Sequence, residues 1–129
     1  MRRILLVTAI MEEADLIRGL LEGLEFAVLI ATTGRAALSQ MITDALDGSP
    51  IDGIVMDDKI RDLDVLTTLR EIHSRDPEMA VIVLSHYTDD QTIERFIEAG
   101  AQQVLSKPVV RTEFREACLR IFPAPSGHA

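Results

Sequence analysis

The chain has 129 residues, 47% of them apolar and 26% charged, which suits one soluble globular domain that needs neither disulfides nor metal for its core. Its formal net charge of −8 argues against a nucleic-acid-binding surface, because phosphate contacts need clustered Lys and Arg. No apolar run approaches the ~20 residues that cross a bilayer. The single cysteine, Cys118, can form no internal disulfide, so we expect a buried thiol and a reducing cytoplasm.

Five short apolar runs recur along the chain without polar alternation, which is typical of strands covered on both faces. They are Ile4 to Val7, Phe26 to Ala31, Ile54 to Met56, Ala80 to Leu84, and Val104-Leu105. The segments between them have the i, i+3, i+4 spacing of amphipathic helices, as in Ala14, Ile17, Leu20, Leu21 and Leu24.

Turn and capping residues fall between these segments. Gly23, Gly48-Ser49-Pro50, Asp76-Pro77 and Gly100 mark expected helix ends, and Thr88 with Asp89-Asp90 marks a helix start. Five βα units predict an α/β fold with a doubly wound, five-stranded parallel sheet, (βα)5, between two helical layers. We expect one domain over residues 1–122 and a disordered tail over 123–129, with no second domain.

Polar side chains follow several predicted strands, at the edge where ligands of open parallel sheets bind. Asp57 ends the third, Ser85 the fourth, and Lys107 follows the fifth. A carboxylate can attack a phosphoryl group, a hydroxyl can donate to a phosphoryl oxygen, and an ammonium can neutralise its charge. Each residue alone is ordinary at a strand end, whereas their convergence on one edge favours a functional site.

The order of these motifs resembles the receiver domain of two-component response regulators, a flavodoxin-like (CheY-like) module. The matching segments run from residue 3 to about 122: Ile4 to Val7, Asp52 to Asp57, Asp64, Leu69-Arg70, Val81 to Ser85, Gly100-Ala101 and Lys107-Pro108. The resemblance implies a phosphorelay signalling domain and not an enzyme, with Asp57 as phosphoacceptor, Ser85 as switch hydroxyl and Lys107 as phosphate-contacting lysine. It also implies a cis peptide bond before Pro108.

The chain departs from this family where Mg²⁺ should bind. Two acidic residues normally end the first strand and hold the metal with the phosphoacceptor, but Thr8 and Ala9 stand there. Mg²⁺ prefers octahedral oxygen coordination anchored by carboxylates, so Asp57 alone predicts weak or absent metal binding. We expect Glu12 and Glu13 to stabilise the first helical turn instead of reaching the site.

Three further positions near the cleft depart from the family pattern. The loop after Asp57 lacks the family's Met-Pro and glycine turn, so its conformation is open. Lys59 either pairs with Asp57 in place of the metal or extends into solvent. His86 follows the switch hydroxyl and is expected to crowd the cleft, and Val104 replaces the aromatic residue that many receivers use as a switch.

Three functions remain open from the sequence. The chain is an atypical phosphoacceptor with impaired Mg²⁺-dependent phosphorylation, or a pseudo-receiver that binds proteins independently of phosphate, or a small flavodoxin-like ligand-binding domain or enzyme. The absence of a glycine-rich phosphate loop weakens the third.

The resemblance names partners of two kinds. A sensor histidine kinase or phosphotransfer protein would act upstream. A downstream protein would bind the face of the fourth helix, fifth strand and fifth helix, with Thr92, Arg95, Val104, Arg111 and Arg115 as candidate positions. The chain either acts alone as such a partner or is one part of a longer protein.

Overall fold

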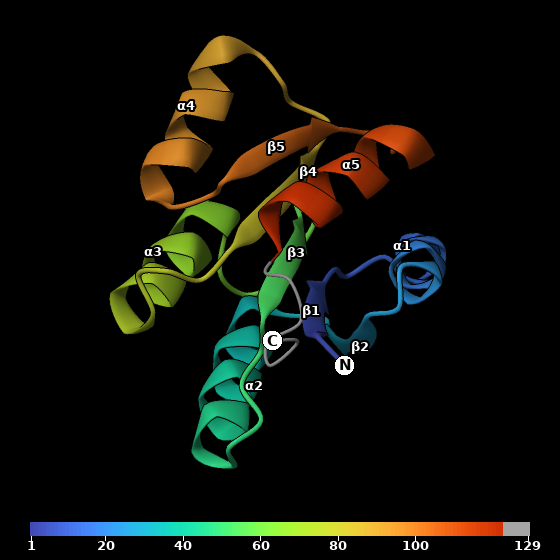
Figure 1. Ribbon diagram of the computed structural model, residues 1–129. Coiled ribbons are helices and arrows are strands. Elements are labelled where there is room, and N and C mark those ends of the chain that lie inside the picture. The colour runs from blue at the N-terminus through green and yellow to red at the C-terminus, as the bar shows by residue number, and fades with distance from the viewer. Residues whose placement is uncertain (123–129) are drawn as a thin grey trace.

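A computed structural model describes residues 1–122. Five strands form one sheet, and Figure 1 shows helices on both sides of it. The strands are β1 (Arg3–Val7), β2 (Ala27–Ala31), β3 (Gly53–Asp57), β4 (Val81–Ser85) and β5 (Gln103–Ser106). The helices are α1 (Met11–Gly23), α2 (Gly34–Leu46), α3 (Val65–Arg75), α4 (Asp90–Ala99) and α5 (Arg111–Ile121). The predicted α/β fold is confirmed, and the tail prediction for 123–129 lies outside the described residues.

All strand pairs are parallel, and the spatial order is β2-β1-β3-β4-β5. The chain therefore leaves β1 toward β2 and then returns to its other side as β3. In open α/β sheets a reversal of this kind opens a crevice at the carboxyl ends of the two flanking strands. The residues that follow β1 and end β3 consequently lie where a ligand site is expected.

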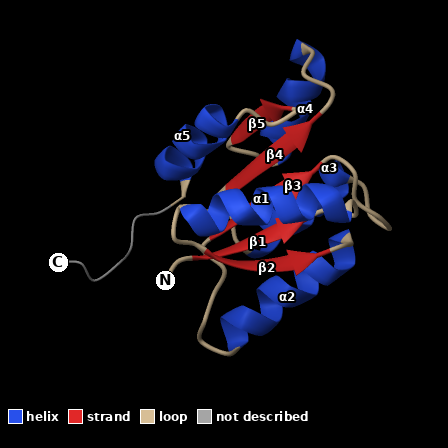
Figure 2. Ribbon diagram, turned by 90° about the vertical axis from the view of Figure 1, so that its right-hand side faces the viewer, coloured by secondary structure: helices blue, strands red, loops and turns tan. Residues whose placement is uncertain are grey.

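Two hydrophobic clusters fill the space on either face of the sheet. One contains side chains from α1 and α5, and the other contains side chains from α2, α3 and α4. Figure 2 shows α1 passing in front of the strands. Ile4 to Val7 of β1 are all buried, whereas the edge strand β2 is mostly half-buried. The apolar runs of the sequence thus match a sheet covered on both faces.

The observed strand bounds differ from the predicted ones by a residue or two, and one difference has a packing reason. Phe26 precedes β2 instead of starting it, and its ring contacts Phe122 edge-on at a centroid distance of 5.8 Å. Both rings are buried. Phe26 and Phe122 therefore pack together at one end of the cluster under α1 and α5, and this contact holds the end of α5 against the sheet.

Candidate functional site

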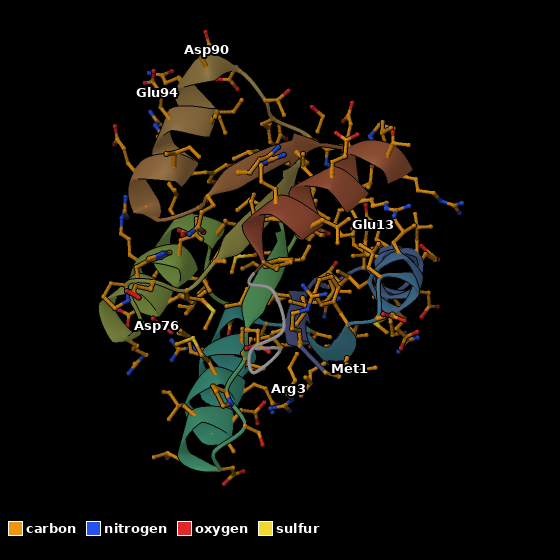
Figure 3. All side chains as sticks on the ribbon, viewed as in Figure 1. Met1, Arg3, Glu13, Asp76, Asp90 and Glu94 are labelled. Atoms are coloured by element: carbon orange, nitrogen blue, oxygen red, sulfur yellow. The ribbon has the colours of Figure 1, made fainter. Side chains whose placement is uncertain are left out.

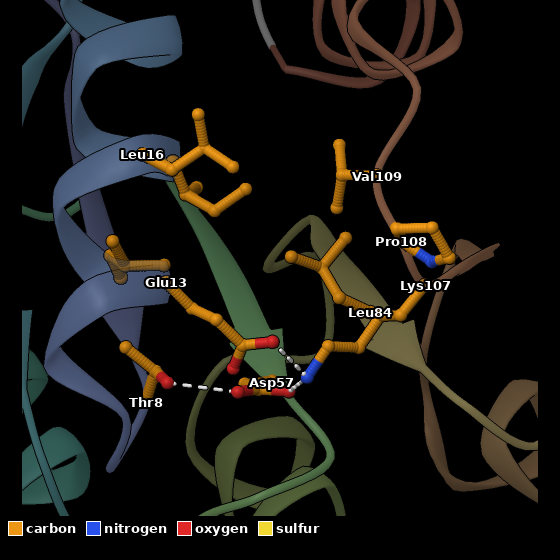
Figure 4. A pocket seen from close by; sticks show the side chains of 10 residues that line it. Thr8, Glu13, Leu16, Asp57, Leu84, Lys107, Pro108 and Val109 are labelled. Carbon is orange, nitrogen blue, oxygen red and sulfur yellow. Dashed lines mark hydrogen bonds and ion pairs between the residues drawn. The ribbon is translucent and has the colours of Figure 1, made fainter.

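Asp57 is the last residue of β3, and its side chain is buried among residues from three other elements. The register between β1 and β3 pairs Val7 with Met56, so Thr8 and Asp57 leave neighbouring strands at the same level. Lys107 reaches the same place from the loop between β5 and α5. Figure 4 shows these three side chains meeting, with Glu13 of α1 beside them.

Thr8 binds one oxygen of Asp57. Its hydroxyl donates to Asp57 Oδ2 at 2.8 Å and accepts from the backbone N–H of Ile10 at 3.2 Å. The second contact fixes the direction of the first, because a hydroxyl that accepts from Ile10 has its proton free for the carboxylate. Thr8 therefore supplies a neutral, oriented donor at the position where the family usually supplies a carboxylate.

Lys107 binds the other oxygen of Asp57. Its Nζ lies 2.6 Å from Asp57 Oδ1, 2.7 Å from Glu13 Oε1 and 3.6 Å from Asp58 Oδ1, and its side chain is 5% exposed. The peptide bond between Lys107 and Pro108 is cis, as the family resemblance implied. One buried ammonium thus faces three carboxylates, each from a different position in the chain.

Glu13 and Lys107 stabilise each other's charged forms. Burial raises the pKa of Glu13, but its contact with the Lys107 ammonium outweighs that effect, so the pKa lies below its ordinary value. Burial lowers the pKa of Lys107, but its bonds to Asp57 and Glu13 outweigh that effect and raise the pKa above its ordinary value. Glu13 and Lys107 are therefore both charged near neutral pH.

The prediction that Glu13 does not reach the site is wrong, since its side chain contacts Lys107. Glu12, in contrast, is exposed. A signal for this was present in the sequence. Glu13 lies four residues before Ile17 and so shares the buried face of α1, where a glutamate needs a partner. The partner could not be foreseen, because Lys107 is 94 positions further along the chain.

Ser85 lies at the end of β4 as predicted, but its hydroxyl is directed away from Asp57. It contacts Asp58 Oδ2 at 3.3 Å and the backbone of Tyr87, accepting from its N–H at 2.9 Å. Asp58 Oδ2 also accepts from the His86 N–H at 2.9 Å, and the His86 ring lies 3.6 Å from it. His86 therefore contacts Asp58, and the crowding of the cleft at Asp57 stays a prediction.

The loop after β3 is held by backbone contacts and by Asp62. The Lys59 carbonyl, which in the family contributes to the metal site, accepts from the Ala9 N–H at 3.0 Å. The Lys59 side chain is exposed, and none of the ion pairs among residues 1–122 joins it to Asp57. Asp62, at a φ of 65°, accepts from the Gly34 N–H at the start of α2 at 2.9 Å. No local sequence pattern predicts this cap.

The residues around Asp57 do not fit Mg²⁺. Ala9 has no oxygen in its side chain, and the Thr8 hydroxyl is a neutral oxygen that already donates to Asp57, so neither residue replaces a carboxylate as a metal ligand. Within residues 1–122, no group of three His, Cys, Asp or Glu side chains is arranged to hold a metal ion. Octahedral coordination of Mg²⁺ is usually anchored by one or two carboxylates, and here the residues that follow β1 supply none.

The candidate partner residues divide between two surfaces. Thr92 and Arg95 lie on α4, and Val104 of β5 is half-buried against the core. Arg111 and Arg115 line a groove beside Gly19 and Gly23 of α1, so they lie on the α1 side of α5. Figure 3 shows Asp90 and Glu94 on α4, far from Glu13 on α1. The face over α4, β5 and α5 therefore stays a prediction.

Comparison with known proteins gives one consistent family. The family model of the response regulator receiver domain matches residues 4–119. The transcriptional regulatory protein ZraR of Escherichia coli strain K12 is 27% identical over 106 residues, which are 82% of this chain and 23% of that protein. The chain thus spans about a quarter of the length of the curated relatives it matches.

Solved structures agree with this match. A receiver domain protein from Clostridium thermocellum is 28% identical, with a TM-score of 0.80 over 93% of each chain. The receiver domain of the sensor histidine kinase PA1611 from Pseudomonas aeruginosa, in which a magnesium ion is coordinated in the active site cleft, is 24% identical. Its TM-score is 0.80 over 93% of this chain and 96% of that one. This second likeness concerns the fold alone.

Proposed function

The chain belongs to the family of response regulator receiver domains, and we propose that it works there as a pseudo-receiver, a protein-interaction module independent of phosphorylation. One observation carries the proposal: the carboxylate of Asp57 is bound on one oxygen by the Thr8 hydroxyl and on the other by Lys107. The nucleophile of the family is thereby engaged by the chain's own side chains, without the acidic pair that attracts the metal.

The charge balance supports this proposal. Phosphoryl transfer depends mainly on positioning and on stabilisation of the charge that develops on the transferring oxygens. In this chain the only cation within bonding distance of Asp57 among the described residues is Lys107, and Glu13 shares it. An incoming phosphoryl donor would therefore meet excess negative charge where the family offers a divalent cation.

A working phosphoacceptor is the second candidate, and one contact favours it. Lys107 keeps its 2.6 Å contact with Asp57, from a loop with the cis bond that the family resemblance implied. In this reading Asp57 takes the phosphoryl group, Lys107 contacts its oxygens, and Ser85 rotates toward it. Transfer would be slow, because Thr8 and Ala9 do not help to bring the metal.

We also propose that the chain is a cytoplasmic signalling domain without enzymatic activity of its own, and that residues 1–122 form the receiver domain. None of the helices in residues 1–122 is long and apolar enough to cross a membrane. The partners are a sensor histidine kinase or phosphotransfer protein and a downstream protein. The downstream protein would bind α4, β5 and α5.

The test is incubation with phosphoramidate or acetyl phosphate, with and without Mg²⁺, followed by intact mass measurement. We expect no phosphoryl increment in the natural chain. Replacing Thr8 and Ala9 together with aspartate should restore Mg²⁺-dependent labelling, and adding Asp57→Ala to that variant should abolish it again. A stable adduct on the natural chain that disappears in Asp57→Ala would overturn the pseudo-receiver and establish the second candidate.

A further inference from the structure

Glu13 is the most exposed residue of the charged cluster around Lys107. It lies on the first turn of α1, and its side chain is 33% exposed, whereas Asp57 and Lys107 are 3% and 5% exposed. A cavity of about 100 Å³ lies beside these three residues, between α1 and the loop that precedes α5. Figure 4 shows Glu13 and Leu16 on one side of it and Pro108 and Val109 on the other.

Two of the three N–H donors of Lys107 are bonded to neighbouring carboxylates. An ammonium has three N–H groups. One reaches Asp57 Oδ1 and one reaches Glu13 Oε1, while Asp58 Oδ1 at 3.6 Å lies beyond hydrogen-bond distance. One N–H therefore remains for a phosphoryl oxygen, and a second bond from Lys107 to the phosphoryl group would have to replace Glu13, the more exposed of its two bonded partners.

The charge of the cluster also opposes an anion. Three carboxylates and one ammonium, −3 and +1, leave a net charge of −2 in a largely buried site. Removing the Glu13 charge would leave −1. Like charges at such short range repel strongly in a medium less polar than water. The second oxygen of Glu13, Oε2, is buried and accepts no hydrogen bond, so no donor offsets the negative charge on that oxygen.

From these contacts we propose that Glu13 is a blocking residue: it binds the phosphate-contacting lysine and keeps phosphoryl groups and their analogues away from Asp57. The proposal rests on the proposed function and deepens it. The loss of the acidic pair explains why a metal is not attracted. Glu13 adds a second, independent barrier, located on α1, that remains when the acidic pair is restored.

The test separates the two barriers. Beryllofluoride with Mg²⁺, a non-covalent phosphoryl analogue, is titrated into the Thr8→Asp/Ala9→Asp protein while amide NMR shifts are recorded. Adding Glu13→Gln to this protein should lower the beryllofluoride concentration at half-saturation by about tenfold, the effect of one unfavourable charge contact. Adding Glu12→Gln instead removes an exposed carboxylate one residue away, and should change it by less than about twofold.

The outcomes distinguish this proposal from the proposed function. Equal half-saturation in the Glu13→Gln and Glu12→Gln proteins, or binding in neither, would overturn the blocking role. Phosphoryl transfer to the natural chain would overturn the pseudo-receiver. The blocking role would still be decided by the half-saturation of the Glu13→Gln and Glu12→Gln proteins. Circular dichroism checks the fold of each variant. If the doubly substituted protein does not fold, the same comparison in Ala9→Asp alone, which keeps the Thr8 bond, decides the question.

Discussion

The two sides of Asp57 have diverged to different degrees. On the side of β5, Lys107 and the cis bond before Pro108 keep the arrangement that the receiver family resemblance implies. On the side of β1, a threonine and an alanine stand where two acids are usual, and a carboxylate arrives from α1 instead. The site has therefore kept the cation that pairs with Asp57 and has lost the carboxylates that would bind a metal beside it.

The largest loss of stability should come from removing Lys107, the cation that contacts both Asp57 and Glu13. Lys107→Met should lower the free energy of unfolding at neutral pH by about 3 kcal/mol, because it leaves the buried Asp57 carboxylate without its ionic partner. Urea unfolding followed by circular dichroism measures the loss. As a control, Lys59→Met removes an exposed lysine near the same site and should cost less than about 0.5 kcal/mol. Equal losses would mean that the cluster contributes no stability of its own.

The location of this site was predictable, and its bonding was only partly so. Asp57, Ser85 and Lys107 end or follow strands, and apolar runs locate strands well when both faces of a sheet are covered. Gly100, at a φ of 126°, ends α4 as its residue type predicts. These signals are local, since each depends on a few neighbouring residues.

The features that could not be predicted are contacts between distant segments. Glu13 meets Lys107 across 94 positions, and Asp62 caps α2 across 28. Side chains such as Ser85 also choose among several partners within reach, here Asp58 and the backbone of Tyr87. Such choices depend on loop geometry, and the loop after β3 had lost the proline and glycine that usually define it.

The β1 side is tested by removing one hydroxyl. Thr8→Val keeps the shape of the side chain but takes a donor from Asp57 and an acceptor from the Ile10 N–H. Hydrogen bonds to charged groups are worth about 1.5–3 kcal/mol, so we expect a loss of about 2 kcal/mol in the free energy of unfolding. Thr43→Val on α2, an exposed threonine remote from this site, is the control. A loss no larger than that of the control would show that Thr8 is not a substantial support of Asp57.

The smallest effect should come from Glu13, the carboxylate that α1 adds to the site, and this effect should depend on pH. Glu13→Gln removes a pair that is one-third exposed on the Glu13 side, so solvent screening limits the expected loss to about 0.5 kcal/mol at pH 7. The folded protein lowers the pKa of Glu13 below its ordinary value of 4.5. The stabilisation is therefore fully present above pH 4.5 and disappears as the pH falls through the lowered pKa. Unfolding free energies of the natural chain and Glu13→Gln, measured from pH 7 to pH 3, should converge at the acid end. A difference that stayed constant over this range would mean that Glu13 stabilises the fold by packing and not by its charge.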